Sequence, residues 1–320
     1  MAQVINPLVP GKVKEPLRVR FVRSLRKYWP YYVMLLPAVI YFVIFCYGPM
    51  YGVQIAFKDF KIKKGFGGSP WADPWFKYFV QFFESYYAWN IIRNTLILSV
   101  YGLLAGFPIP IILALSMDEM RMQKTKKVIQ TITYAPNFIS TVVMCGMIIN
   151  FTSQTGGLIN NAIKACGGEA IPFMYKENLF PHIYVWTGIW QSMGWSSVIY
   201  FAALSGINPQ LLEAATLDGA SRWQKIIHVK LPTILPIVVI QLILNAGSLL
   251  NVGYEKVYLL QNSLNLNTSE VISTYVYKRG MVDAQYSFST AVGLAQSIVS
   301  FVMVFLVNAL ANKISETSLW

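Results

Sequence analysis

Six long apolar runs, separated by polar segments, dominate the hydrophobic pattern of the chain. A helix needs roughly 20 residues to cross the hydrocarbon core of a membrane, and each run is about that long or longer. The runs lie at residues 31–57, 92–117, 128–151, 182–206, 232–254 and 287–310. They predict an all-α polytopic membrane protein with six transmembrane helices (31–310), a basic tail at 1–30 and a short tail at 311–320.

The composition agrees with this prediction. Of the 320 residues, 55% are hydrophobic and 12% are charged, whereas soluble domains have about 25% charged residues. The net charge of +12 comes from cations beside apolar runs, which is typical of cytoplasmic loops, so we expect membrane lipid and no nucleic acid as a partner. About 15 of the 26 Lys and Arg residues fall on the side that we expect to be cytoplasmic, together with both termini. Five lysines within residues 58–77 weigh against this orientation.

The sequence contains no pattern that indicates a catalytic, cofactor or metal site. The three cysteines and two histidines lack ligand-like spacing, and the phosphate-binding loop of an ATPase is absent, so we expect no enzyme and no cofactor. Ionisable residues do not occur deep in the six predicted spans; Arg93 and His182 lie at span ends. Ion-coupled transporters commonly use intramembrane ionisable groups as relays, which weighs against that class.

The polar segment 208–232 lies between two apolar runs and predicts a cytoplasmic helix-turn-helix. Its signals are an N-cap before a proline, a turn, a capping box and a closing Leu-Pro pair, at Asn208, Pro209, Asp218, Gly219, Ser221, Gln224, Leu231 and Pro232. We expect the Leu-Pro pair to end the second short helix before the fifth span begins.

This segment resembles the EAA loop of the inner-membrane permease subunits of ATP-binding-cassette (ABC) importers. That loop reads Glu-Ala-Ala, a glycine four residues later and, after nine more residues, Ile-x-Leu-Pro. Here Val229 replaces the isoleucine. The resemblance implies that the loop couples the permease to an ATPase through Glu213, Ala214, Ala215, Asp218, Gly219, Ala220, Leu231 and Pro232.

Two further stretches extend the resemblance over nearly the whole chain. Trp89 followed by the Asn-Thr-Leu of 94–96 is similar to the pattern that begins the second span of sugar permeases. Residues 47–60 resemble the same stretch of the permeases that import oligosaccharides or polysaccharide fragments. The resemblance implies a type I ABC importer permease fold in the cytoplasmic membrane. It also implies a carbohydrate substrate and, as partners, a second permease, two ABC ATPase subunits and an external solute-binding lipoprotein. An ion-coupled transporter and a non-transporting membrane scaffold remain alternatives.

Uncharged polar and aromatic residues in the predicted spans are candidates for the substrate pathway. Neutral hydroxylated ligands bind amides and flat apolar ring faces. The candidates are Trp186, Trp190, Gln191, Asn245, Asn251 and Gln296. The same residues would equally serve in helix–helix contacts or in an interfacial aromatic belt, and this alternative stays open for each of them.

Overall fold

The computed structural model describes residues 17–315, with side chains from Arg26 to Lys313. Most of these residues are helical, and their only β-type pairing is an isolated bridge between Lys58 and Trp71. The first sixteen residues of the predicted basic tail and the last five of the C-terminal tail lie outside the described part. The chain divides into two compact units, Met1–Gln54 and Ile55–Trp320, which are described separately.

The first unit is dominated by one long helical segment. It consists of α1 (Leu17–Tyr41), a π-helical turn η1 (Phe42–Tyr47), α2 (Gly48–Met50) and the first residues of η2 (Tyr51–Phe57). The last three residues of η2 belong to the second unit. The stretch Arg26–Phe57 has 32 residues and is apolar enough to cross a membrane. The first predicted span, 31–57, falls within it.

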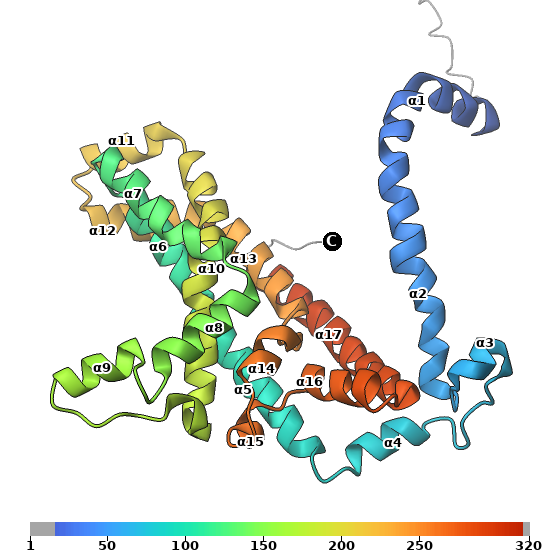
Figure 1. Cartoon of the computed structure of the whole chain (residues 1–320). Helices are drawn as coiled ribbons and strands as arrows, with labels where there is room; N and C mark the ends of the chain where they lie inside the picture. Colours follow the sequence, from blue (N-terminus) through green and yellow to red (C-terminus); the bar gives the residue numbers. More distant parts are fainter. Residues whose placement is uncertain (1–16, 316–320) are drawn as a thin grey trace, which may run out of the picture. The chain divides into compact units, whose positions relative to one another are not determined.

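Three long helices of the second unit are also apolar enough to span. They are the run Ala88–Asp118 (α5, Ala88–Gly106, and α6, Pro108–Asp118), the run Arg222–Gly247 that ends in α13 (Leu231–Gly247), and α17 (Tyr286–Ser315). Helix α10 (Phe180–Ser205) has 26 residues, but its serines, Gln191 and tryptophans make it less apolar. Figure 1 shows these helices in the second unit. The α5–α6 run contains the second predicted span, and α17 contains the sixth. Helix α10 contains the fourth predicted span except for its last residue, Gly206.

The region of the third predicted span, 128–151, is not one straight helix. It contains α7 (Gln123–Tyr134), the 3₁₀ turn η4 (Ala135–Phe138) and α8 (Thr141–Thr152), and the pair bends by 101°. Pro136 lies in the turn, and Ser140 caps α8 by accepting a hydrogen bond from Val143 N, so the sequence both interrupts and restarts the helix. Helix α7 packs closely on α10: a Cβ atom on Gly194 would lie 2.0 Å from Thr133 O.

The second arm of the 208–232 hairpin does not end at the Leu-Pro pair, and that expectation was wrong. Helix α12 (Arg222–Lys225) continues through a π-helical turn η7 (Ile226–Lys230) directly into α13. The wider turn precedes Pro232, which has no N–H to donate, so the helix passes the proline without breaking. The helix ends at Gly247, and residues 248–253 of the fifth predicted span are not helical.

Shorter helices connect the spans of the second unit. They are η3 (Ile62–Lys64), α3 (Gly65–Gly68), α4 (Lys77–Phe83), α9 (Leu158–Ala165), η5 (Phe173–Tyr175), η6 (Glu177–Leu179), α14 (Tyr254–Leu260), α15 (Leu266–Ser269), α16 (Ile272–Tyr277) and η8 (Lys278–Val282). Buried Asn265 ties two of these segments together, because its Nδ2 donates to Met174 O at 3.0 Å and to Leu260 O at 3.1 Å.

The buried core follows the α5–α6 run in three clusters. Around Ile91, α4 and α5 pack against α16 and α17. Around Leu98, α5 and α8 pack against α14. Around Ala114, α6 packs against α10 and α13.

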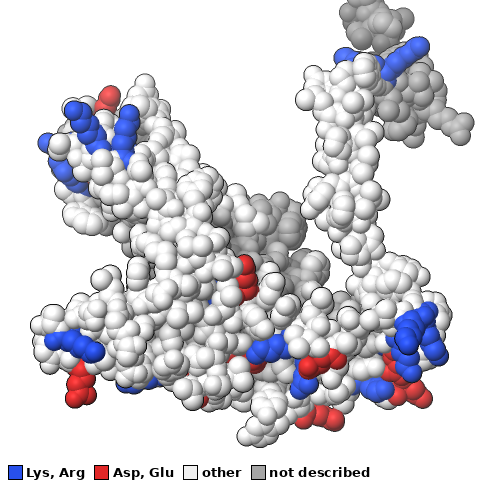
Figure 2. All heavy atoms as spheres, in the orientation of Figure 1, with Lys and Arg blue, Asp and Glu red and all other residues white. Residues whose placement is uncertain are grey.

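Charged side chains of the second unit gather at its two ends. Figure 2 shows basic residues over the end formed by α7, α11 and α12, mixed charges over the end with α4, α9 and α15, and a nearly uncharged belt between them. An uncharged belt between two charged ends is the surface expected of a protein embedded in a membrane.

Candidate functional site

The 208–232 hairpin begins with a capped helix, as predicted. The Asn208 side chain accepts a hydrogen bond from Gln210 N at 3.0 Å. Pro209 occupies the first turn of α11 (Pro209–Leu217), where its missing N–H costs nothing. The Asn-Pro pair therefore fixes where the first arm starts.

The turn after α11 gives a physical reason for the spacing of alanine and glycine in the motif. Gly219 N donates to Thr216 O at 3.1 Å, and Ala220 N donates to Ala215 O at 2.9 Å. This pair of bonds is a Schellman motif, which needs a left-handed residue just after the helix. Gly219 has φ of 77°, a conformation that glycine adopts without strain. The glycine four residues after Ala215 therefore ends the first arm.

The second arm starts with the predicted capping box. Gln224 N donates to Ser221 Oγ at 3.3 Å, and Ser221 N donates to Gln224 Oε1 at 2.7 Å. Lys225 Nζ then donates to Thr216 Oγ1 at 2.8 Å. This bond joins the two arms.

A buried ion pair attaches the hairpin to the end of α6. Lys230 Nζ lies 2.6 Å from Asp118 Oδ2 and also contacts Glu119 Oε1, and only 8% of the lysine side chain is exposed. Leu212 and Leu231 pack against the core cluster that joins α6, α10 and α13. The base of the hairpin is therefore fixed to these three helices.

The outer part of the hairpin is exposed and partly apolar. Leu217 and Trp223 expose 89% and 73% of their surface. Of the motif residues, the exposed ones are Glu213, Ala214, Asp218, Gly219 and Pro232, and the half-buried ones are Ala215, Ala220 and Leu231. Large exposed apolar side chains beside a charged end are typical of a surface that contacts another protein.

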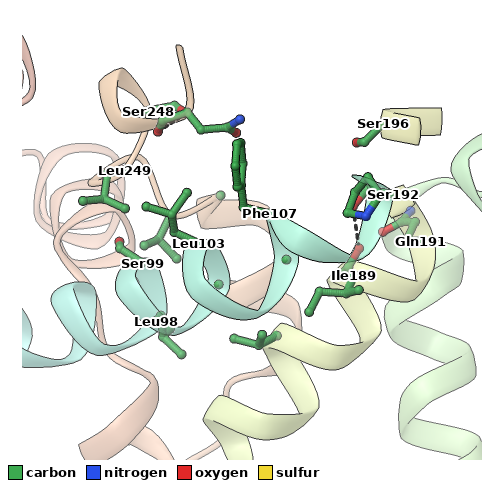
Figure 3. A pocket seen from close by; sticks show the side chains of 18 of the residues that line it. Leu98, Ser99, Leu103, Phe107, Ile189, Gln191, Ser192, Ser196, Ser248 and Leu249 are labelled. Carbon is green, nitrogen blue, oxygen red and sulfur yellow. Dashed lines mark hydrogen bonds between the residues drawn. The ribbon is translucent and has the colours of Figure 1, made fainter. Parts of the chain in front are cut away.

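The same three helices line a cavity of about 630 Å³. Its walls come from α5, α6, α10, α13 and the segment 248–256. Figure 3 shows Leu98, Leu103 and Leu249 on one side of this space, and Gln191, Ser192 and Ser196 on the other. The walls are about equally polar and apolar, and a space of this size can hold a small polar molecule.

The structure brings three of the six candidate pathway residues to this cavity. Gln191, Asn245 and Asn251 line it, and Asn251 also lines a second cavity of about 460 Å³ together with Gln296. Trp186 and Trp190 line neither cavity. Trp186 Nε1 donates instead to Tyr101 Oη at 2.8 Å. Another tryptophan of the same helix, Trp195, lines the first cavity in their place.

Two lining residues that were not among the sequence candidates have unusual surroundings. Ser99 Oγ is the one buried side-chain polar atom without a hydrogen-bond partner in the described residues. Lys256, on α14, is only 9% exposed, and its Nζ donates to Tyr184 O at 2.9 Å. Burial lowers the pKa of Lys256 to about 8. Its sequence position after the fifth predicted span gave no sign of this location.

Comparison with known proteins identifies the family. The family described as "Binding-protein-dependent transport system inner membrane component" matches residues 106–316. The chain belongs to this family. The matched residues include the whole hairpin and all of the helices that line the cavity except most of α5.

The permease is similar to two curated proteins over most of its length. It is 40% identical over 320 residues to the polygalacturonan/rhamnogalacturonan transport system permease protein YteP of Bacillus subtilis (strain 168), which covers 100% of this chain and 99% of YteP. It is also 40% identical over 289 residues to protein LplB of the same organism, with 90% of each chain covered.

A solved structure shares the fold. The permease matches a chain of a bacterial alginate ABC transporter in complex with an alginate pentasaccharide-bound periplasmic protein. The TM-score is 0.86 at 38% identity, over 94% of the permease and 100% of that chain. The expected all-α, type I ABC importer permease fold is confirmed, and the chain is an integral membrane transport subunit.

Proposed function

We propose that the permease forms, with a second permease subunit, the membrane pathway of an ATP-driven importer of oligosaccharides. The similarity to YteP carries this proposal, because it extends over the full length of both chains and YteP is named as a polygalacturonan/rhamnogalacturonan permease. The alginate transporter supports the same class of substrate and the participation of an external binding protein.

The cavity has the chemistry that an oligosaccharide requires. The hydroxyl groups of a sugar need hydrogen-bonding partners. The amide nitrogens of Gln191 and Asn245 donate to Ile139 O and Gln241 O, and Ser192 Oγ donates to Gly188 O, so their oxygens serve as acceptors. Sugar rings stack on flat apolar faces such as that of Trp195. The amides of Asn251 and Gln296 extend this polar lining into the second cavity. We therefore assign the substrate pathway to these two cavities.

The hairpin is the proposed contact with the ATPase subunits. Its exposed apolar side chains, Leu217 and Trp223, need a partner surface. Its base is fixed to α6, α10 and α13, which also line the cavity. A displacement of the hairpin when the ATPases close would therefore reach the pathway through packed helices. ATP hydrolysis itself belongs to the separate ATPase subunits.

We place the hairpin in the cytoplasm, together with both termini. The end that carries α7, α11 and α12 is basic on the face shown in Figure 2, whereas the opposite end has mixed charges. Cytoplasmic loops carry an excess of Lys and Arg. The lysines within residues 58–77 are then external, and one of them is neutralised, because Lys77 Nζ lies 3.1 Å from Asp59 Oδ1.

Uptake into proteoliposomes tests this function. The complete complex is reconstituted with ATP inside, and with the binding protein and tritiated short oligogalacturonates outside. We expect uptake that needs ATP and the binding protein and that persists when ionophores dissipate the ion gradients. Uptake that stops with the ionophores and ignores ATP would show an ion-coupled transporter instead. ATP hydrolysis without uptake of any oligosaccharide would refute the carbohydrate assignment.

A further inference from the structure

Lys256 is the one charged side chain that lines the larger cavity in the described part of the chain. The other lining residues are apolar, aromatic, hydroxyl-bearing or amide-bearing. Helix α14 carries the lysine, and α10 lies against it: the ammonium is 4.9 Å from the centre of the Tyr184 ring. An isolated cation on the wall of a transport pathway strongly affects which ligands can pass.

The charge of Lys256 is not neutralised. In the described residues no carboxylate lies within 4.0 Å of its Nζ, since the ion pairs found there use other lysines and an arginine. Its one hydrogen bond goes to Tyr184 O, whereas an ammonium group has three donors. A buried cation without a counter-ion is unfavourable, so the site favours an anion that enters the cavity.

The neighbouring backbone leaves room for this ammonium group. A Cβ atom on Gly188 would lie 3.1 Å from Lys256 Nζ, so the glycine lets the ammonium lie directly against α10. The polar side of the same helix, with Gln191 and Ser192, faces the same cavity. A cation and neutral hydrogen-bonding groups therefore lie along one wall.

We infer that Lys256 binds the carboxylate of an acidic sugar in the pathway. This inference rests on the proposed function and adds the charge of the substrate to it. The carboxylate accepts charge-assisted hydrogen bonds from the ammonium, and the amides and hydroxyls of α10 and α13 bind the sugar hydroxyls.

A purely structural role for Lys256, as a link between α14 and α10, is the competing explanation. Substitution by glutamine separates the two roles. Lys256→Gln keeps a side-chain donor for Tyr184 O but removes the charge, and Lys256→Arg keeps the charge. Lys164→Gln is the matched control, because Lys164 is exposed on α9 and outside the cavity.

The test measures ATP-dependent uptake of trigalacturonate by the complete complex in proteoliposomes, together with complex yield and basal ATPase rate. Charge-assisted hydrogen bonds are about twice as strong as neutral ones, so Lys256→Gln should lower uptake about tenfold. Uptake by the Lys256→Arg complex should stay within about threefold of the wild-type rate. Uptake by the Lys164→Gln complex should equal the wild-type rate. Complex yield should not change in any variant.

Three results would overturn the inference. Wild-type uptake in Lys256→Gln would show that the charge is not used. A fall in Lys256→Arg as large as that in Lys256→Gln, or a parallel loss of yield and ATPase rate, would show a structural link. These results leave the proposed function standing, whereas a wild-type complex that imports no oligosaccharide refutes both.

Discussion

Lys230→Met removes the ion pair that attaches the hairpin to α6. Methionine keeps an unbranched apolar stem of similar length, so the change is mainly one of charge. In the wild type the ammonium contacts Asp118 and Glu119, which lie at the C-terminal end of α6. Without it, two adjacent carboxylates remain at the end of a helix whose dipole disfavours negative charge. We expect the hairpin to separate from α6 more readily.

The size of this effect follows from the burial of the three side chains. A hydrogen bond to a charged group contributes roughly 1.5–3 kcal/mol to stability. The lysine side chain is 8% exposed, but the carboxylates are 21% and 28% exposed and regain some hydration when it is lost. We therefore expect a loss of roughly 2–3 kcal/mol. This corresponds to an about 30- to 150-fold shift from the attached to the detached hairpin.

The assay is the number of ATP molecules hydrolysed per oligosaccharide imported by the reconstituted complex. In Lys230→Met, hydrolysis should continue while uptake falls, so this ratio rises. Adding Asp118→Asn and Glu119→Gln should restore part of the coupling, because the repulsion disappears. Lys225→Met is the control: its bond to Thr216 is exposed, and we expect a small effect. A ratio that stays at the wild-type value in Lys230→Met would refute the reasoning.

Three further predictions concern the turn, the helix packing and the cavity. Gly219 has φ of 77° and open space around it, so Gly219→Val should lower ATP-dependent uptake much more than Gly219→Asn, because asparagine tolerates this conformation; equal losses would contradict this. A Cβ on Gly194 would lie 2.0 Å from a backbone oxygen, whereas Gly146 has nothing within 4 Å, so Gly194→Ala should destabilise the purified complex by roughly 1–3 kcal/mol and lower its melting temperature, and Gly146→Ala should not. Asn245→Ala should lower oligosaccharide uptake several-fold, and Trp190→Ala, outside both cavities, should leave substrate preference unchanged; the reverse ranking would contradict the assigned pathway.

The hairpin could be predicted from the sequence because its signals are local. An N-cap, a capping box and a left-handed glycine each act over a few residues, and Asn208, Ser221 and Gly219 have the predicted roles. Even there, one signal misled. Pro232 is an ordinary helix-stopping residue in sequence, but a π-helical turn before it lets the helix continue.

The cavity could not be predicted in the same way, because it depends on contacts between segments far apart in the chain. Lys256 lies in a short helix after a span, and only tertiary packing brings it to Tyr184. Trp186 and Trp190 share a helix with Gln191, but of these three residues only the glutamine lines the cavity. The bend between α7 and α8 likewise reflects packing on α10 as well as Pro136.

The central claim is that the hairpin is the surface through which ATPase subunits drive this permease, and cross-linking tests it most directly. Leu217→Cys, at the exposed end of α11, is compared with Lys164→Cys on α9, after removal of Cys46, Cys145 and Cys166. In the assembled complex, a short reagent that reacts with a thiol at one end and an amine at the other should join residue 217, but not residue 164, to the ATPase subunit. A cross-link from residue 164 to the ATPase, or labelling of residue 217 by an impermeant reagent from outside intact cells, would contradict the account.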